Sequence, residues 1–268
     1  MSSSIQNRIK DLEQFRKEFA CPDIKGTFEI HIFMVPTNPE DNFDEIVEQY
    51  IEVTEQLNKE RRLKDPNCNL IKPCLLALDF RGKGYVTVMQ SSRYCVCPDL
   101  ETAVTECNKE ADLYLEKFRE QNVPITIIRE KLETLACSHG VPVTDEEAQK
   151  YPKYFEFHIR VARKNEDTES RITNEELEEL SKISKKFTEQ FGTPVPLSYN
   201  KIRDQQRYLN VRFSGIGSET ARARVAAIVE AIKQSEYFKW IKTIAEYVPY
   251  DSFRALDKGW IDFDDFEN

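Results

Sequence analysis

The sequence predicts an α+β protein built from two tandem ferredoxin-like (βαββαβ) units. A repeated segment is the first observation, since Thr27–Ile32 reads Thr-Phe-Glu-Ile-His-Ile and Tyr154–Ile159 reads Tyr-Phe-Glu-Phe-His-Ile. The second observation is that strand-like and helix-like patterns follow each copy in the same order. The two histidines are 127 residues apart (158 − 31), which is enough for one small domain, so the repeat predicts an internal duplication.

The first predicted unit covers residues 26–135. Its opening strand alternates apolar and polar residues, and the pattern Asn-Phe-Asp-Glu from Asn42 predicts a capping box at the start of a helix. Two glycines in the segment 81–84 predict a hairpin turn. The predicted elements are a strand after Gly26, a helix at 43–63, strands at 74–80 and 84–94, a helix at 99–122 and a strand at 124–134.

The second predicted unit covers residues 154–248. Thr173 to Glu176 predicts another capping box, Gly192 predicts the end of that helix, and Ser218 is expected to cap the next one. Both units therefore follow the order strand, helix, strand, strand, helix, strand, which is typical of ferredoxin-like folds. The predicted elements are strands at 154–161, 195–202, 208–214 and 238–248, and helices that follow Thr173 and Ser218.

Three further segments flank these units. Residues 1–25 are predicted to hold an amphipathic helix, with Ile5, Ile9, Leu12 and Phe19 on one face. Residues 136–153, which contain Gly and Pro, are predicted to be a linker. Residues 249–268 are an acidic and aromatic tail, for which docking into a neighbour and disorder are both open.

Composition limits the classes of function. A net charge of −9 disfavours non-specific binding to nucleic acid or to anionic membranes, because attraction to phosphate needs clustered positive charge. The chain has no run of 18 apolar residues and no signal-peptide pattern, so it is expected to be cytoplasmic and not membrane-bound. Seven cysteines, an odd number, favour reduced thiols. Cys95-Val96-Cys97 lacks the C-x2-C spacing of zinc sites, and we expect no metal and no cofactor.

Strand alternation gathers polar residues on the sheet face that the helices leave open. The two histidines belong to this set, and each follows a glutamate two residues earlier. A carboxylate at that spacing orients an imidazole and raises its pKa. Thr87, Met89 and Ser91 are expected beside His31. The candidate site residues are His31 and His158 as an acid/base pair, with Glu29, Glu156, Arg160, Asn210, Arg212 and Ser214 as ligand-binding residues.

The segment Ser214-Gly-Ile-Gly-Ser218 lies between a predicted strand and a predicted helix. Backbone amides at a helix N-terminus bind anions, so an anion site is one interpretation. A tight turn is the other, and we favour it because a lone Gly-x-Gly is a weak signal.

Two histidines, one in each of two symmetric lobes, resemble the arrangement in the 2H phosphoesterases. The resemblance implies cleavage of a phosphodiester, with one histidine as general base and the other as general acid. It also implies a hydroxyl residue two positions after each histidine. Phe33 and Arg160 stand at those positions, so both hydroxyls are missing.

The C-terminal region resembles a second, uncharacterised family. The shared features are Tyr250-Asp251-Ser252, Leu256-Asp257-Lys258-Gly259-Trp260 and the earlier pair Leu197-Ser198. This resemblance covers mainly the second predicted unit and implies no activity.

The sequence thus favours a cytoplasmic binding module that uses the polar sheet faces of its two units to hold a small phosphorylated ligand or a protein partner. The first alternative is a divergent, metal-independent 2H-like phosphodiesterase that acts on nucleotides or RNA with His31 and His158. The second alternative is a structural subunit that forms oligomers. Whether the chain is an enzyme stays open at this point.

Overall fold

The computed structural model describes residues 23–79, 85–151, 153–164, 173–200 and 206–253. These residues form a mixed α+β fold with eight strands and five helices. The predicted N-terminal helix and the tail beyond residue 253 lie outside the described residues. No helix in the described part of the chain combines the length and the apolar character needed to cross a membrane.

The first group of elements follows the predicted order. Its strands are hydrogen-bonded in the order β4-β1-β3-β2, with β1 antiparallel to both β3 and β4. This order places the opening strand in the centre, between two partners that supply polar side chains to the same face. The elements are β1 (Gly26–Pro36), α2 (Phe43–Lys64), β2 (Lys72–Asp79), β3 (Tyr85–Cys97), α3 (Leu100–Glu120) and β4 (Ile125–Leu135).

The second group repeats this arrangement. Its strands follow the order β8-β5-β7-β6, and β5 pairs antiparallel with β7. A short helix, α4, lies in the segment predicted to be a linker, and β8 continues three residues into the segment predicted to be the tail. The elements are α4 (Asp145–Ala148), β5 (Tyr154–Arg163), α5 (Asn174–Phe191), β6 (Leu197–Asn200), β7 (Gln206–Ser214), α6 (Ser218–Gln234) and β8 (Phe238–Asp251).

The chain divides into two compact units. The described residues up to Cys74, Val88–Gly140 and Val248–Phe253 form unit 1, and the described residues of 75–87 and 141–247 form unit 2. The residues of β2 after Cys74 belong to unit 2 because Leu76–Leu78 pair with β6. The end of β8 belongs to unit 1, where the Ser252 N–H donates to the Glu130 carbonyl at 2.9 Å. Compared with the predicted units 26–135 and 154–248, the end of β2 therefore belongs to the second compact unit, and the end of β8 belongs to the first.

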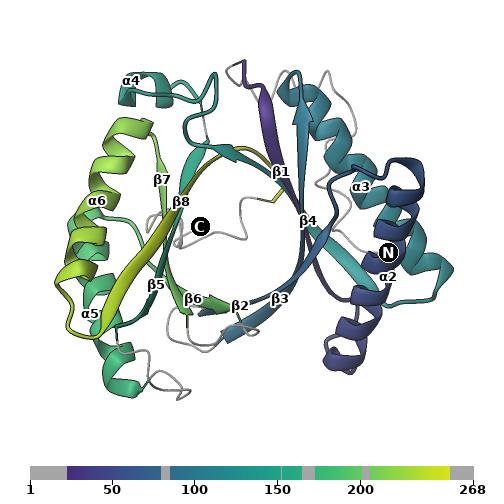
Figure 1. Ribbon diagram of the computed structural model, residues 1–268, viewed down its shortest axis with the longest axis horizontal. Coiled ribbons are helices and arrows are strands. Elements are labelled where there is room, and N and C mark those ends of the chain that lie inside the picture. The colour runs from purple at the N-terminus through teal and green to yellow at the C-terminus, as the bar shows by residue number, and fades with distance from the viewer. Residues whose placement is uncertain (1–22, 80–84, 152, 165–172, 201–205, 254–268) are drawn as a thin grey trace, which may run out of the picture. The chain divides into compact units, whose positions relative to one another are not determined.

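The apolar side of each sheet carries the helices. Figure 1 shows α2 and α3 on one side of the unit 1 strands, and α5 and α6 on one side of the unit 2 strands. Phe28, Ile30 and Ile32 are buried in unit 1, and Phe155 and Phe157 are buried in unit 2. Strand alternation then directs Glu29, His31, Glu156 and His158 to the opposite face.

The helix ends confirm some of the predicted capping signals and correct others. Thr173 and Glu176 form the predicted capping box, and Gly192 ends α5 in the left-handed region with φ of 65°. Asn42 precedes α2 but makes no side-chain capping bond. The N-cap of α6 is Gly217, one residue before the predicted cap. A short polar side chain permits capping, but the neighbouring loop decides which residue does it.

Candidate functional site

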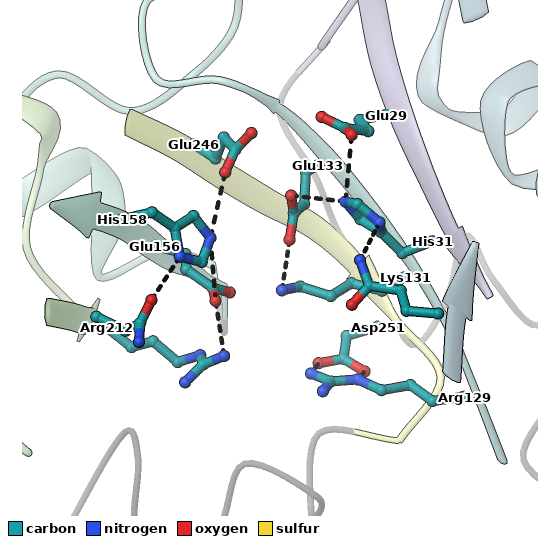
Figure 2. Close-up of polar contacts among 12 residues, drawn as sticks. Glu29, His31, Arg129, Lys131, Glu133, Glu156, His158, Arg212, Glu246 and Asp251 are labelled. Carbon is teal, nitrogen blue, oxygen red and sulfur yellow. Dashed lines mark hydrogen bonds and ion pairs between the residues drawn. The ribbon is translucent and has the colours of Figure 1, made fainter. Parts of the chain in front are cut away.

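The polar face of unit 1 is built around His31, and we name Glu29, His31, Gln90, Lys131 and Glu133 the His31 cluster. Nδ1 of His31 lies 2.6 Å from the side-chain amide nitrogen of Gln90, and Nε2 lies 2.9 Å from Oε2 of Glu133. Lys131 Nζ holds the other oxygen of Glu133 at 2.5 Å, and the Ser92 hydroxyl donates to Glu29. Both ring nitrogens of His31 are therefore held by side chains (Figure 2).

The environment of His31 raises its pKa above the ordinary value. Burial alone lowers the pKa, but the charge and hydrogen bond of Glu133 and the charge of Glu29 together outweigh it, while Lys131 opposes them weakly. The imidazolium form is thus favoured because it neutralises nearby carboxylates.

The polar face of unit 2 is built around His158, and we name Glu156, His158, Asn210, Arg212 and Glu246 the His158 cluster. Nδ1 of His158 lies 2.7 Å from Oδ1 of Asn210. The Asn210 amide nitrogen donates to the Ser198 hydroxyl at 2.9 Å and to the Pro196 carbonyl at 3.4 Å. Because a peptide carbonyl cannot donate, the second contact orients the amide with its oxygen toward the ring. Since a carbonyl oxygen only accepts, the proton lies on Nδ1 of His158 and Nε2 is the nitrogen available for chemistry.

Two carboxylates flank that second nitrogen. Nε2 of His158 lies 3.5 Å from Oε1 of Glu156 and 3.5 Å from Oε2 of Glu246. Arg212 donates to Oε1 of Glu156 at 2.6 Å. Both 3.5 Å distances exceed the roughly 2.7–2.9 Å of a charge-assisted hydrogen bond, so Nε2 is surrounded by acceptors but not tightly bound to either (Figure 2).

The two clusters share one plan. Each takes a Glu-x-His pair from its opening strand, a side-chain amide at Nδ1 from the third strand, and a carboxylate near Nε2 from the last strand. From the sequence, only the two Glu-x-His pairs and Asn210 were predicted as members of this plan. The prediction missed Gln90, Glu133 and Glu246, although charged residues at every second position of a strand, as at 129, 131 and 133, were a signal.

The polar faces are less exposed than predicted. Half of the candidate residues, Glu156, Asn210 and Arg212 together with His31, are buried, and the other half are part-exposed. The two histidine side chains differ in exposure between the units, with 8% of His31 and 27% of His158 exposed. The unit 2 imidazole is thus the accessible one.

The predicted neighbours of His31 on β3 were out of register by one residue. His31 pairs with Ser92, so Gln90 and Ser92 share its face, whereas Met89 and Ser91 point to the helix side. The β3 strand ends three residues later than predicted. Its sequence alone does not show which of its side chains lie on the same face as His31. In unit 2 the predicted parity was correct, because Glu156 pairs with Arg212 and His158 with Asn210.

The remaining predicted ligand-binding residues lie at the two ends of this face. Arg160 pairs with Tyr208 two residues beyond His158, and Ser214 pairs with Tyr154 two residues before Glu156. Both side chains are part-exposed. Nε of Arg160 is buried and makes no hydrogen bond within the described residues.

The glycine-containing loop before α6 is a tight turn. The Gly217 N–H donates to Oδ1 of Asp145 at 2.8 Å, and the Ser218 and Glu219 N–H groups donate to the carbonyls of Pro142 and Val143. The amides that an anion would need are therefore already bonded, which supports the turn interpretation over an anion site.

The Tyr-Asp-Ser segment is held against β4 in unit 1. Asp251 accepts two bonds from Arg129, at 2.8 and 2.5 Å, and the guanidinium lies 5.0 Å from the ring centroid of Phe33. The Ser252 hydroxyl accepts from the Glu130 N–H at 2.8 Å. These contacts give Asp251 and Ser252 a structural role at the end of β8. Figure 2 shows the side chains of Asp251 and Arg129 facing each other.

One set of His, Cys, Asp and Glu side chains within the described residues brings three possible metal donors within 4.8 Å of one another. It consists of Glu29, His31 and Glu133, and each side chain supplies one donor atom. No metal site was predicted from the sequence, because only the cysteines were weighed as ligands and the last strand was not.

No family model matches the chain, and the search of curated proteins found no match. Several solved structures match with distant similarity. A heme-binding protein from Thermus thermophilus has a TM-score of 0.28 at 12% identity, covering 85% of this chain and 94% of that one. A dye-decolorizing protein from V. cholerae has a TM-score of 0.28 at 6% identity, covering 85% and 95%. A protein described as a putative chlorite dismutase has a TM-score of 0.25 at 10% identity, covering 87% and 99%. Similarity at this level carries no inference about this chain.

Proposed function

We propose that the chain is a small-molecule binding protein and that its ligand contacts the His158 cluster of unit 2. The observation that carries this proposal is the exposure of the His158 side chain, 27%, above partners that are almost fully buried. Buried charged groups that converge on one accessible imidazole are typical of functional sites, since a purely structural network has no need to leave its central group accessible.

The charges of this face favour a small phosphorylated ligand. Glu156 and Glu246 repel an anion from Nε2 of His158, so the phosphate is expected beside Arg160, whose Nε has no hydrogen-bond partner among the described residues. An arginine binds phosphate through two parallel N–H donors. The rest of the ligand would then offer a hydrogen-bond donor to Nε2 or to Glu246.

Thermal unfolding with and without phosphate compounds tests this proposal. Inorganic phosphate, ribose 5-phosphate and AMP serve as probes, and a probe at 100 times its dissociation constant stabilises the protein by about 2.7 kcal/mol. We expect His158→Gln and Arg160→Gln to reduce the shift, and Arg119→Gln, an exposed arginine in unit 1, to keep it. Equal shifts in all three variants would place the ligand elsewhere.

The phosphodiesterase alternative has less support. It needs His31 and His158 as an acid and a base, but both ring nitrogens of His31 are held, by Gln90 and by Glu133. These bonds must break before His31 transfers a proton to a substrate. A protein partner and an oligomer-forming role stay predictions, to be tested by light scattering.

We infer that the two units arose by duplication of a ferredoxin-like ancestor. The shared element order, the equivalent strand orders and the shared plan of the two clusters support this inference. A cytoplasmic location is also proposed, and the free thiols of the six described cysteines support it.

A further inference from the structure

Two carboxylates face each other across neighbouring strands in unit 1. Glu29 of β1 pairs directly with Glu133 of β4, and their side chains are only 13% and 6% exposed. Like charges directly opposite each other destabilise a sheet, and burial adds the cost of removing each carboxylate from water. A positive charge close to both carboxylates would offset these costs.

Lys131 contacts Glu133, whereas Arg129 forms its ion pair with Asp251. Among Glu29, Glu133 and Lys131, two negative charges face one positive charge when His31 is neutral. A proton on His31 restores the balance, and so does a bound cation.

The donor atoms are arranged as a cation would require. Nε2 of His31 lies 2.9 Å from Oε2 of Glu133 and 3.9 Å from Oε1 of Glu29. Two ligand atoms that are each about 2.1 Å from a tetrahedral metal lie about 3.4 Å apart, which falls between these two distances. On the other side of the ring, the Ser91 carbonyl oxygen lies 3.3 Å from Nδ1, and a carbonyl that accepts from this nitrogen is typical of histidines that bind metals.

We propose that Glu29, His31 and Glu133 bind a divalent transition metal ion through Nε2 of the imidazole and one oxygen of each carboxylate. One nitrogen and two oxygen donors suit Zn²⁺, Mn²⁺ or Fe²⁺, whereas Ca²⁺ prefers oxygen ligands alone and Cu⁺ prefers sulfur. Three protein ligands leave further coordination positions for water. This site lies in unit 1 and does not depend on the ligand proposed for the His158 cluster.

Titration of the chelator-treated full chain with Co²⁺, and with Zn²⁺ in competition, tests the site. We expect one equivalent of Co²⁺ to bind and to produce visible absorption bands. His31→Gln and Glu133→Gln each remove a ligand and are expected to weaken binding at least tenfold. His139→Gln removes the exposed histidine after β4 and should bind Co²⁺ as the unmodified protein does.

A second measurement needs no variant, in case a substituted protein fails to fold. Substoichiometric Mn²⁺ is expected to broaden the imidazole NMR signals of His31 before those of His158 and His139. Binding that is absent at millimolar metal overturns the proposal. So does binding that His31→Gln and Glu133→Gln leave unchanged, or broadening that begins at His158.

Discussion

The ion pair between Arg129 and Asp251 offers a direct test of how the end of β8 is held in unit 1. Asp251→Asn keeps the size of the side chain and removes its charge. The two side chains are 4% and 6% exposed and share two hydrogen bonds. In the variant, one N–H of Arg129 faces the nitrogen of the introduced amide instead of an acceptor, and the buried guanidinium loses the charge of Asp251.

The size of the effect follows from this burial. Removing one partner of a buried ion pair costs about 3–5 kcal/mol, because the remaining charge is left without compensation. For a chain of this size, 1 kcal/mol lowers the melting temperature by roughly 2–4 °C. Asp251→Asn is therefore expected to lower the melting temperature by about 6–20 °C.

Urea and thermal unfolding followed by circular dichroism measure this change. The double variant Arg129→Leu/Asp251→Leu removes both charges, and replacing a buried pair by apolar side chains is often neutral or stabilising. It should therefore be more stable than Asp251→Asn. A loss below about 1 kcal/mol for Asp251→Asn, or a double variant less stable than the single one, would refute the assigned role of the pair.

Three further predictions concern other parts of the molecule. The folded-state pKa of His31 is raised, so its ionisation stabilises the protein fully below a pH of about 6.5. This contribution is lost as the pH rises through the raised pKa. The urea midpoint of the unmodified protein should therefore fall between pH 5.5 and pH 9, and that of His31→Gln should change less. Burial raises the pKa of the Cys95 thiol to about 12, so iodoacetamide at pH 8 should modify Cys95 at least tenfold more slowly than exposed Cys137, as peptide mass spectrometry would report; comparable rates contradict this assignment. Gly217→Ala places a methyl group 2.2 Å from the Val143 carbonyl oxygen and should destabilise the protein, whereas Gly215→Asn, at φ of 70° with open space around it, should be tolerated; equal melting temperatures would argue against the close approach.

The order of the elements was predictable because local patterns specify it. The opening segments Phe28–Ile32 and Phe155–Ile159 alternate between apolar and polar residues, and α5 carries a complete capping box followed by a left-handed glycine. Asn42 misled the prediction because it has the right type of side chain but makes no capping bond. The boundaries of the compact units depend on pairing between strands that are distant in the sequence, such as Leu76–Leu78 with β6. No local sequence pattern predicts that pairing.

The candidate site was predictable only in part for the same reason. Glu29 and Glu156 were found because each lies two residues before a histidine on the same strand. Glu133 and Glu246 come from the last strand of each βαββαβ set, and only the register of the folded sheet places them beside Nε2. Burial of the polar faces was missed because alternation shows which face a side chain occupies and does not show what covers it.

The difference between the two clusters supports the two different roles that we propose for them. In the His31 cluster, Glu133 approaches to 2.9 Å and Lys131 holds its second oxygen, so the imidazole is fixed among charges that a proton or a metal ion balances. In the His158 cluster, both carboxylates stay at 3.5 Å, and the imidazole edge is accessible. The residue two positions after each histidine also differs, because it is Phe33 in unit 1 and Arg160 in unit 2. A phenyl ring packs against Arg129, whereas a guanidinium attracts an anion. These differences between the clusters favour the proposed binding of a cation in unit 1 and of a phosphorylated ligand in unit 2.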